Sequence, residues 1–148
     1  LETIPNIHEA KVLAQCLREV TTPAWVSFCC RDDRSLSDGT PIEEAVALFN
    51  GHPRVRALGI NCMAPGNIPS LMRRITRTTD LPILVYPNSG ETYDPHEHCW
   101  IGEVAADLAG NAATDWISLG AKGVGGCCRM SDEHIRSMSQ IIDKYDYG

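Results

Sequence analysis

The sequence predicts an α/β fold in which parallel strands alternate with helices. Short apolar runs bounded by turns alternate with segments whose apolar residues recur at helical spacing. The connections are short, which favours parallel strands joined by right-handed helical crossovers. An open doubly wound sheet and part of a (β/α)8 barrel both satisfy this pattern. A complete barrel needs about 250 residues, so a chain of 148 residues would hold only its second half.

The first part of the chain predicts alternating elements that follow a strand end at 1–3. A helix is expected over about 7–20, where apolar residues follow the spacing of a buried stripe. The apolar run 24–29 predicts a buried strand. The segment 40–49 opens with a capping threonine, a proline and a carboxylate three residues after the cap, and so predicts a second helix.

The remaining elements continue the alternation. Strands are expected over 55–60, 81–86 and 123–126, and helices over about 68–78 and 112–119 and after residue 131. Ser131 caps the last helix, whose inward residues are expected to be Ile135, Met138 and Ile142.

The segment 91–121 is the hardest to interpret, apart from the helix expected over about 112–119. Gly102 and Gly110 interrupt any single helix there, and a loop containing Tyr93, Asp94 and Pro95 is expected instead.

Composition excludes several classes of partner. The formal net charge is −6 and the basic residues are scattered, so neither nucleic acid nor an anionic membrane surface is expected to bind. No apolar run approaches the roughly 20 residues of a membrane span. The first residues lack the basic and apolar regions of a secretory signal, so we expect a cytoplasmic protein whose sequence opens in mid-fold.

The chain has seven cysteines, of which four form two vicinal pairs. An odd number without a secretory signal argues against a disulfide framework and favours metal ligands or free thiols in a reducing compartment. Cys16 and Cys99 are interpreted as a helix and a loop residue without a metal role.

Polar and thiol side chains fall where the predicted strands end. In parallel α/β folds these carboxyl ends gather functional residues on one face. The residues concerned are Glu2, Cys29, Cys62, Asn88 and the pair Cys127–Cys128. The thiols of Cys62, Cys127 and Cys128 suit zinc, and three protein ligands leave the fourth tetrahedral position open for a substrate.

Two other clusters compete for a metal. Cys29 and Cys30 form a second vicinal pair at a strand end, although core packing or a free thiol is the simpler interpretation. His96 and His98 flank Glu97 close to Cys99, in a polar loop where solvent exposure is the simpler interpretation.

Three motifs resemble the homocysteine S-methyltransferase family. They are Gly59-Ile60-Asn61-Cys62, Val85-Tyr86-Pro87-Asn88-Ser89-Gly90-Glu91 and Gly125-Gly126-Cys127-Cys128-Arg129, in the same order at strand ends. The likeness is greatest to the enzymes that use S-methylmethionine or S-adenosylmethionine. It implies that residues 1–148 are the C-terminal half of a (β/α)8 TIM barrel, a partial homocysteine-binding domain without its N-terminal half.

The resemblance also implies the chemistry of the site. A zinc ion on Cys62, Cys127 and Cys128 would bind L-homocysteine through its sulfur, and the thiolate would attack the methyl group of a sulfonium donor to give methionine. This reaction needs no protein base once the thiol proton has left. Glu2 is similar to the acidic residue that binds the substrate ammonium group, and Asn61 and Asn88 would position substrate or backbone.

Further contacts to the donor are expected from aromatic and loop residues. Tyr86, Tyr93 or Trp116 could face the sulfonium cation through cation–π attraction, although such aromatics are more often core residues. Glu91, Tyr93 and Asp94 could cover the donor. Arg129 would either pair with a nearby carboxylate or be solvated.

Several alternatives stay open at this point. The site could be a structural zinc domain that His96 or His98 closes as fourth ligand, or a thiol redox module that uses one of the vicinal cysteine pairs. The donor could be betaine or methylcobalamin. The chain could also be an inactive half barrel, which exposes two sheet edges and could associate with another copy or with a missing N-terminal half.

Overall fold

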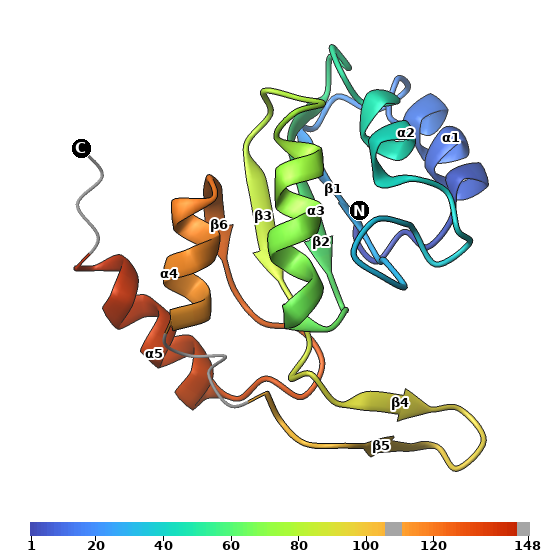
Figure 1. The fold of residues 1–148 in the computed structure, drawn as a ribbon. Coiled ribbons are helices and arrows are strands. Elements are labelled where there is room, and N and C mark those ends of the chain that lie inside the picture. The colour runs from blue at the N-terminus through green and yellow to red at the C-terminus, as the bar shows by residue number, and fades with distance from the viewer. Residues whose placement is uncertain (106–110, 145–148) are drawn as a thin grey trace.

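The computed structural model describes residues 1–105 and 111–144, and its centre is a four-stranded parallel sheet (Figure 1). Its strands lie in the order β1 (Ala24–Phe28), β2 (Val55–Asn61), β3 (Ile83–Tyr86) and β6 (Ala121–Val124). Each strand pairs with the next in parallel, so all four carboxyl ends meet at one edge. The parallel α/β fold predicted from the alternation is confirmed.

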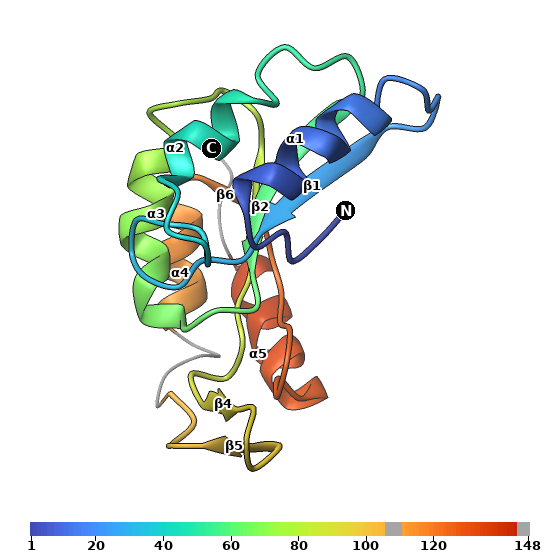
Figure 2. The same cartoon turned by 90° about the vertical axis from the view of Figure 1, so that its right-hand side faces the viewer.

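The helices form a single sequential layer. They are α1 (Ile7–Cys16), α2 (Ile42–Ala47), α3 (Ile68–Ile75), α4 (Asn111–Ser118) and α5 (Asp132–Ile142). Each contacts the next along the chain, and Figure 2 shows α2, α3 and α4 together on one side of the sheet. A doubly wound sheet reverses its strand order at a switch point, whereas this order runs without reversal. The arrangement is therefore that of a barrel segment.

Alternation along the strands separates a core face from a less covered face. Val26, Phe28, Leu58 and Ile60 are completely buried on the side of the helices. On the opposite face, by contrast, the side chain of Trp25 is 51% exposed. Parallel sheets normally have both faces covered, so the described residues leave this second face only partly covered.

Residues 1–4 run beside the end of β1. The backbone N–H of Ser27 donates to the carbonyl of Leu1 at 2.9 Å, and the N–H of Ile4 donates to that of Ser27 at 3.0 Å. Ile4 and Phe28 form an isolated parallel bridge. The strand end expected at 1–3 is thus a short backbone pairing that holds Glu2 next to the carboxyl edge of the sheet.

Two helices end earlier than the sequence predicted. Helix α1 ends at Cys16 and not at residue 20 as predicted. The residues that follow disfavour a helix, because Val20 is β-branched and Pro23 restricts the residue before it. Helix α3 ends at Ile75 instead of 78, where the hydroxyls of Thr76 and Thr78 bond to carbonyls four residues back.

The start and end of α2 also differ from the prediction. Pro41, not Thr40, occupies the N-cap position, and it makes no side-chain capping bond. The helix ends at Ala47, two residues before the predicted Phe49.

The loop expected after residue 91 contains an antiparallel hairpin. Strand β4 (Thr92–Asp94) pairs with β5 (Cys99–Ile101), and the rings of Tyr93 and Trp100 lie 5.4 Å apart across the two strands. Aromatic and β-branched residues on either side of a proline-containing turn favour such a hairpin. Gly110, the second expected interruption, lies outside the described residues.

The last strand and helix differ in detail from the prediction. Strand β6 is Ala121–Val124, so the glycines at 125 and 126 follow it and do not belong to it. Ser131 caps α5 as expected, and its backbone N–H donates to His134 Nδ1 at 3.0 Å. Met138 is buried, but Ile135 is 44% exposed and does not point inward as predicted.

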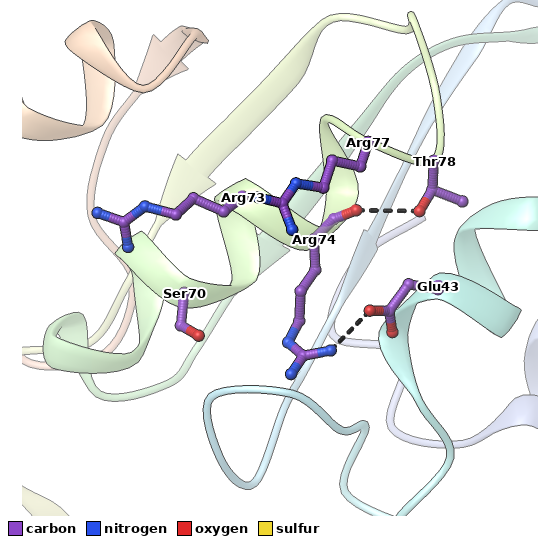
Figure 3. Close-up of a pocket in the computed structure, with 6 residues that line it drawn as sticks. All are labelled: Glu43, Ser70, Arg73, Arg74, Arg77 and Thr78. Atoms are coloured by element: carbon purple, nitrogen blue, oxygen red, sulfur yellow. Dashed lines mark hydrogen bonds and ion pairs between the residues drawn. The ribbon is translucent and has the colours of Figure 1, made fainter.

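Helices α2 and α3 are joined by an ion pair at their outer surface (Figure 3). Arg74 Nη1 lies 2.7 Å from Glu43 Oε1, beside an open cavity of about 280 Å³ that Ser70, Arg73 and Arg77 help to line. Because both paired side chains are more than a third exposed, the pair contributes at most about 1 kcal/mol. Among the described residues, no helix is both long and apolar enough to cross a membrane.

Close packing of the less covered face predicts a specific requirement for glycine at position 59. A Cβ there would lie 2.9 Å from Ser27 Oγ and 3.1 Å from the Leu84 carbonyl oxygen. We therefore expect Gly59→Ala to lower the free energy of unfolding by about 1–3 kcal/mol. Gly66→Ala is the control, because a Cβ at Gly66 would meet nothing within 4 Å. Urea unfolding of both variants checks this, and equal midpoints would contradict it.

Candidate metal centre

Three cysteine sulfurs meet at the carboxyl edge of the sheet. Cys62 follows β2, and Cys127 and Cys128 follow β6. The Sγ atom of Cys128 lies 3.6 Å from that of Cys62 and 3.9 Å from that of Cys127, and all three lie within 4.8 Å of one another. A tetrahedral zinc site with Zn–S bonds of about 2.3 Å places its sulfurs about 3.8 Å apart. The donor set and its spacing therefore fit zinc.

Cys62 is held in an uncommon backbone conformation. Its φ is 54°, in the left-handed region, which costs about 1–3 kcal/mol for a residue other than glycine. Its N–H donates to the Tyr86 carbonyl at 3.3 Å, and its own carbonyl accepts a bond from the Cys29 thiol at 3.4 Å. These contacts on both sides of the residue stabilise the turn that directs its sulfur toward the other two.

The metal-free thiol of Cys62 is hard to ionise. Burial is the main cause that raises its pKa, and the neighbouring Cys128 and Cys127 raise it further. At neutral pH this thiol therefore carries its proton in the metal-free chain.

The segment that carries Cys127 and Cys128 extends the pairing of β3 with β6. The N–H of Gly125 donates to the carbonyl of Val85 at 2.9 Å, and the N–H of Cys127 donates to that of Pro87 at 2.8 Å. The N–H of Ser89 then donates to the Cys128 carbonyl at 3.1 Å. These bonds continue the ladder past both strands.

Glycine at position 126 is required by close packing. A Cβ there would lie 2.6 Å from the Cβ of Met130, so the turn after Cys127–Cys128 can fold back only over a residue without a side chain.

Asn61, expected to contact substrate or backbone, connects several segments behind the sulfurs. Its side chain is fully buried, and its Oδ1 accepts bonds from Thr3 N at 3.1 Å and Ser27 Oγ at 2.9 Å. Its Nδ2 donates to Thr3 Oγ1 at 2.7 Å and lies 4.0 Å from Cys127 Sγ. The amide thus links the segment next to Glu2 with Cys127.

Glu2 and Tyr86 line a cavity of about 290 Å³ that reaches Gly125 and Gly126, next to Cys127. The Glu2 side chain is exposed. The Tyr86 hydroxyl is buried and has no hydrogen-bond partner among the described residues, and burial is the main cause that raises its pKa. The cavity therefore offers the Glu2 carboxylate, and it extends to the glycines that precede Cys127.

Asn88 shapes the turn after β3. It is 8% exposed, and its Oδ1 accepts a bond from the N–H of Gly90 at 2.9 Å. Gly90 has a φ of 97°, which suits glycine. The N–H of Asn88 also donates to the Met63 carbonyl at 3.1 Å, so the turn is attached to the residue that follows Cys62.

Glu91 forms an ion pair with Arg129. The sequence alone left open whether Arg129 pairs with a carboxylate or is solvated. Arg129 Nε lies 3.1 Å from Glu91 Oε2 and Arg129 Nη2 lies 3.2 Å from Oε1, while Ser89 Oγ donates to Oε2 at 2.7 Å. The bonds from Arg129, followed by that from Ser89, lower the pKa of Glu91. The Glu91 carboxylate therefore points at Arg129, the neighbour of Cys128.

The remaining candidates do not belong to the group of three sulfurs. Burial raises the pKa of Cys30 to about 12, and Cys30 packs in the core. Cys29 is half-buried beside Cys62 but does not belong to the three-sulfur group. His96 and His98 are exposed on the hairpin. Within the described residues, these three cysteines form the only group of three or more side chains that could hold a metal ion, and the group includes no histidine.

The aromatic residues proposed for a sulfonium cation differ in position. Trp116 is 1% exposed and belongs to the core, whereas Tyr93 is 46% exposed on the hairpin. Tyr86 is the one of the three that shares a cavity with Glu2.

Relatives with solved structures share this architecture. The homocysteine methyltransferase MmuM from Escherichia coli, in its metallated form, superposes with a TM-score of 0.76 at 36% sequence identity, over 93% of this chain and 42% of that protein.

Two relatives match at the level of sequence. Homocysteine S-methyltransferase YbgG of Bacillus subtilis is 42% identical over 139 residues, and the Escherichia coli homocysteine S-methyltransferase is 44% identical over 140. Each alignment covers 93% of this chain but only 44% and 45% of the respective relative. The chain therefore spans less than half the length of these relatives.

A sequence profile of the homocysteine S-methyltransferase family matches residues 1–142. This match covers nearly the whole chain, including all three motifs and the three-sulfur group. The chain belongs to the homocysteine S-methyltransferase family.

Proposed function

We propose that this chain is the zinc-binding C-terminal half of an enzyme that methylates the thiol of L-homocysteine to give methionine. The observation that carries the proposal is the group of three sulfurs within 4.8 Å of one another at the carboxyl edge of a parallel sheet. Family membership supports the acceptor, because the relatives are named for it. In this proposal residues 1–148 are part of a homocysteine-binding domain, and the remaining part of a barrel comes from an N-terminal half or from another copy.

The metal part of the proposal assigns zinc to Cys62, Cys127 and Cys128. Their spacing fits a tetrahedron with one free position. Bound there, zinc would hold the homocysteine sulfur as a thiolate at neutral pH, because coordination lowers a thiol pKa that is normally near 8.5. Keeping these ligands reduced requires a reducing compartment, so we propose the cytoplasm.

The methyl transfer itself is a displacement between two sulfurs. The homocysteine thiolate forms a bond to the donor methyl carbon while the bond from that carbon to the donor sulfur breaks, and its electron pair leaves the donor as a neutral thioether. The thiol proton goes to solvent, so no side chain acts as a base. The chain's residues bind and orient the thiolate.

The proposed substrate contacts are based on the cavity that reaches Gly126, the neighbour of Cys127 in sequence. We assign Glu2 to the ammonium group of homocysteine, because its exposed carboxylate lines that cavity. Asn61 and Asn88 complete the proposed set. Asn61 is supported by its place behind Cys127, and Asn88 by the turn it forms beside Met63.

The proposed donor is a sulfonium compound, S-methylmethionine or S-adenosylmethionine. The support is the motif from Val85 to Glu91, which resembles the enzymes of that type. Assays of the purified chain, alone and with the N-terminal half of a relative, would compare both sulfonium donors with betaine and methylcobalamin. Transfer from betaine or methylcobalamin alone would contradict this assignment.

Zinc content and X-ray absorption of the purified chain test the open site directly. We expect one zinc per chain and a sulfur coordination number that rises from three to four when homocysteine is added. Four protein ligands unchanged by homocysteine would indicate a structural site, and a dithiol that cycles without metal would indicate a redox module.

Substitution of each ligand should remove zinc. We expect Cys62→Ser, Cys127→Ser and Cys128→Ser each to weaken zinc binding by at least about 100-fold, because a soft thiolate is replaced by a poor ligand. Cys99→Ser, at an exposed cysteine on the hairpin, is the matched control and should bind like the wild type. Zinc affinity is measured by competition with a chromophoric chelator. Equal losses in the control would contradict the assignment.

Zinc affinity should fall as the pH falls. Because its pKa is raised, the Cys62 thiol is protonated in the metal-free chain and must lose that proton when zinc binds. Zinc affinity is therefore expected to drop by at least about tenfold for each pH unit below neutrality. Competition titrations at several pH values, corrected for the chelator's own protonation, check this. An affinity independent of pH would show that the thiols are already ionised.

Loss of the Glu2 carboxylate should weaken homocysteine binding but not zinc binding. We expect Glu2→Gln to raise the homocysteine dissociation constant about tenfold, as for loss of one charge-assisted hydrogen bond at an exposed position. Glu19→Gln, at an exposed glutamate outside the cavity, is the control. Calorimetric titration of the zinc-loaded variants separates the two effects, and an unchanged dissociation constant would remove Glu2 from the site.

A further inference from the structure

We propose that Ser89, Glu91 and Arg129 form a clamp that positions the Cys127 and Cys128 sulfurs for the metal. All three are positioning residues, because they act through the backbone of the two cysteines. This inference rests on the proposed function and deepens it, since it names what holds the three-sulfur group in a geometry suited to zinc.

The two cysteines are fixed from opposite sides. On their N-terminal side, the bonds Gly125 N to Val85 O and Cys127 N to Pro87 O continue the ladder between β3 and β6. On their C-terminal side that backbone ladder ends with the bond from Ser89 N to Cys128 O. The side chains of Glu91 and Arg129 then make the next connection between the same two segments.

The ion pair between Glu91 and Arg129 has a more specific geometry than a typical ion pair at a protein surface. The guanidinium of Arg129 meets both oxygens of Glu91, at 3.1 and 3.2 Å, and such two-point pairing fixes orientation as well as distance. Glu91 is only 8% exposed and Ser89 is fully buried, and Ser89 Oγ bonds the same carboxylate at 2.7 Å. The ion pair between Glu43 and Arg74, by contrast, consists of one contact at 2.7 Å, and Glu43 is 36% exposed where Glu91 is 8% exposed; both arginines are partly exposed.

The backbone next to Cys128 needs such support. Arg129 has a φ of 66°, a conformation that residues other than glycine rarely adopt. The conformation directs the chain sharply away just after the second sulfur, and Met130 N closes the turn on the Cys127 carbonyl at 3.2 Å. Without the bond to Glu91, Arg129 is free to leave the left-handed region, and the Cys128 sulfur moves with it.

The test compares zinc binding by Glu91→Gln and by Glu43→Gln. Both variants remove one charge from a Glu–Arg pair, but only the first pair touches the cysteine segment. Glu91→Gln is expected to weaken zinc binding about 10- to 100-fold, as found for residues that orient metal ligands, while Glu43→Gln stays within twofold of the wild type. Urea unfolding of the metal-free variants is measured in parallel, so that a general loss of stability is recognised.

Cobalt provides a readout that a purely structural role would not change. At saturating Co²⁺ we expect Glu43→Gln to reproduce the wild-type sulfur-to-cobalt charge-transfer band, and Glu91→Gln to show a weaker band per cobalt because one sulfur is displaced. Identical spectra and zinc affinities for the two variants would overturn the clamp.

Two further variants guard against a simple folding defect. Arg129→Lys keeps the charge but loses the two-point contact, so it should lose most of the affinity that Glu91→Gln loses. Ser89→Ala keeps the ion pair and should show a smaller loss. A wild-type affinity for Arg129→Lys would overturn the clamp.

The outcomes separate the clamp from the proposed function. If the wild type and Glu91→Gln both bind zinc normally, the clamp proposal is contradicted and the proposed function is not. Normal zinc binding without any change on addition of homocysteine removes the proposed function and leaves the clamp, and a wild-type chain that takes up no zinc removes both.

Discussion

Parallel pairing of the strands is the constraint on which the rest of this structure depends. Because β2, β3 and β6 pair side by side in one direction, their carboxyl ends meet at one edge although Cys62 and Cys128 are 66 positions apart in sequence. Parallel pairing requires helical crossovers, and these helices cover and bury one face of the sheet. The loops that follow the strands are then free to carry polar and thiol groups without disturbing the core.

Strand pairing brings the three cysteines to one edge of the sheet, and local backbone conformation then sets the positions of their sulfurs. Cys62 and Arg129 both adopt left-handed conformations next to the sulfur group, and each is tied to a neighbouring segment by hydrogen bonds. Strained residues persist when surrounding contacts determine them. The sulfurs thus reach their spacing through a rigid scaffold of hydrogen bonds and close packing, in which Asn61 connects the N-terminal residues to the sheet.

Much of the fold was predictable because its signals are local. Apolar runs and helical spacing identified the first three strands of the main sheet, and the alternation predicted parallel pairing. The fourth strand, β6, was expected two residues too late, because its glycine-rich sequence gives no clear apolar run. Helix ends were less predictable, since Thr76 and Thr78 bond back to helix carbonyls by geometry that no pattern of apolar residues encodes. The hairpin was missed because its aromatic pair, Tyr93 and Trp100, becomes visible only when the turn between the strands is known.

The site was predictable in its residues but not in its connections. The motifs placed Cys62, Cys127 and Cys128 at strand ends, and the structure brings their sulfurs together. No sequence pattern showed that Asn61 would bond to Thr3, or that Glu91 would turn toward Arg129, because both contacts join residues far apart in the chain.

The separation of the ligands along the sequence has a consequence for the unfolded chain. A metal ion bound to both Cys62 and Cys128 would act as a cross-link that closes a loop of 66 residues. By the chain-entropy relation for cross-links, such a closure removes conformational freedom from the denatured ensemble equivalent to about 4 kcal/mol. A metal bound at this site would thereby also cross-link the ends of strands β2 and β6 and stabilise the folded chain.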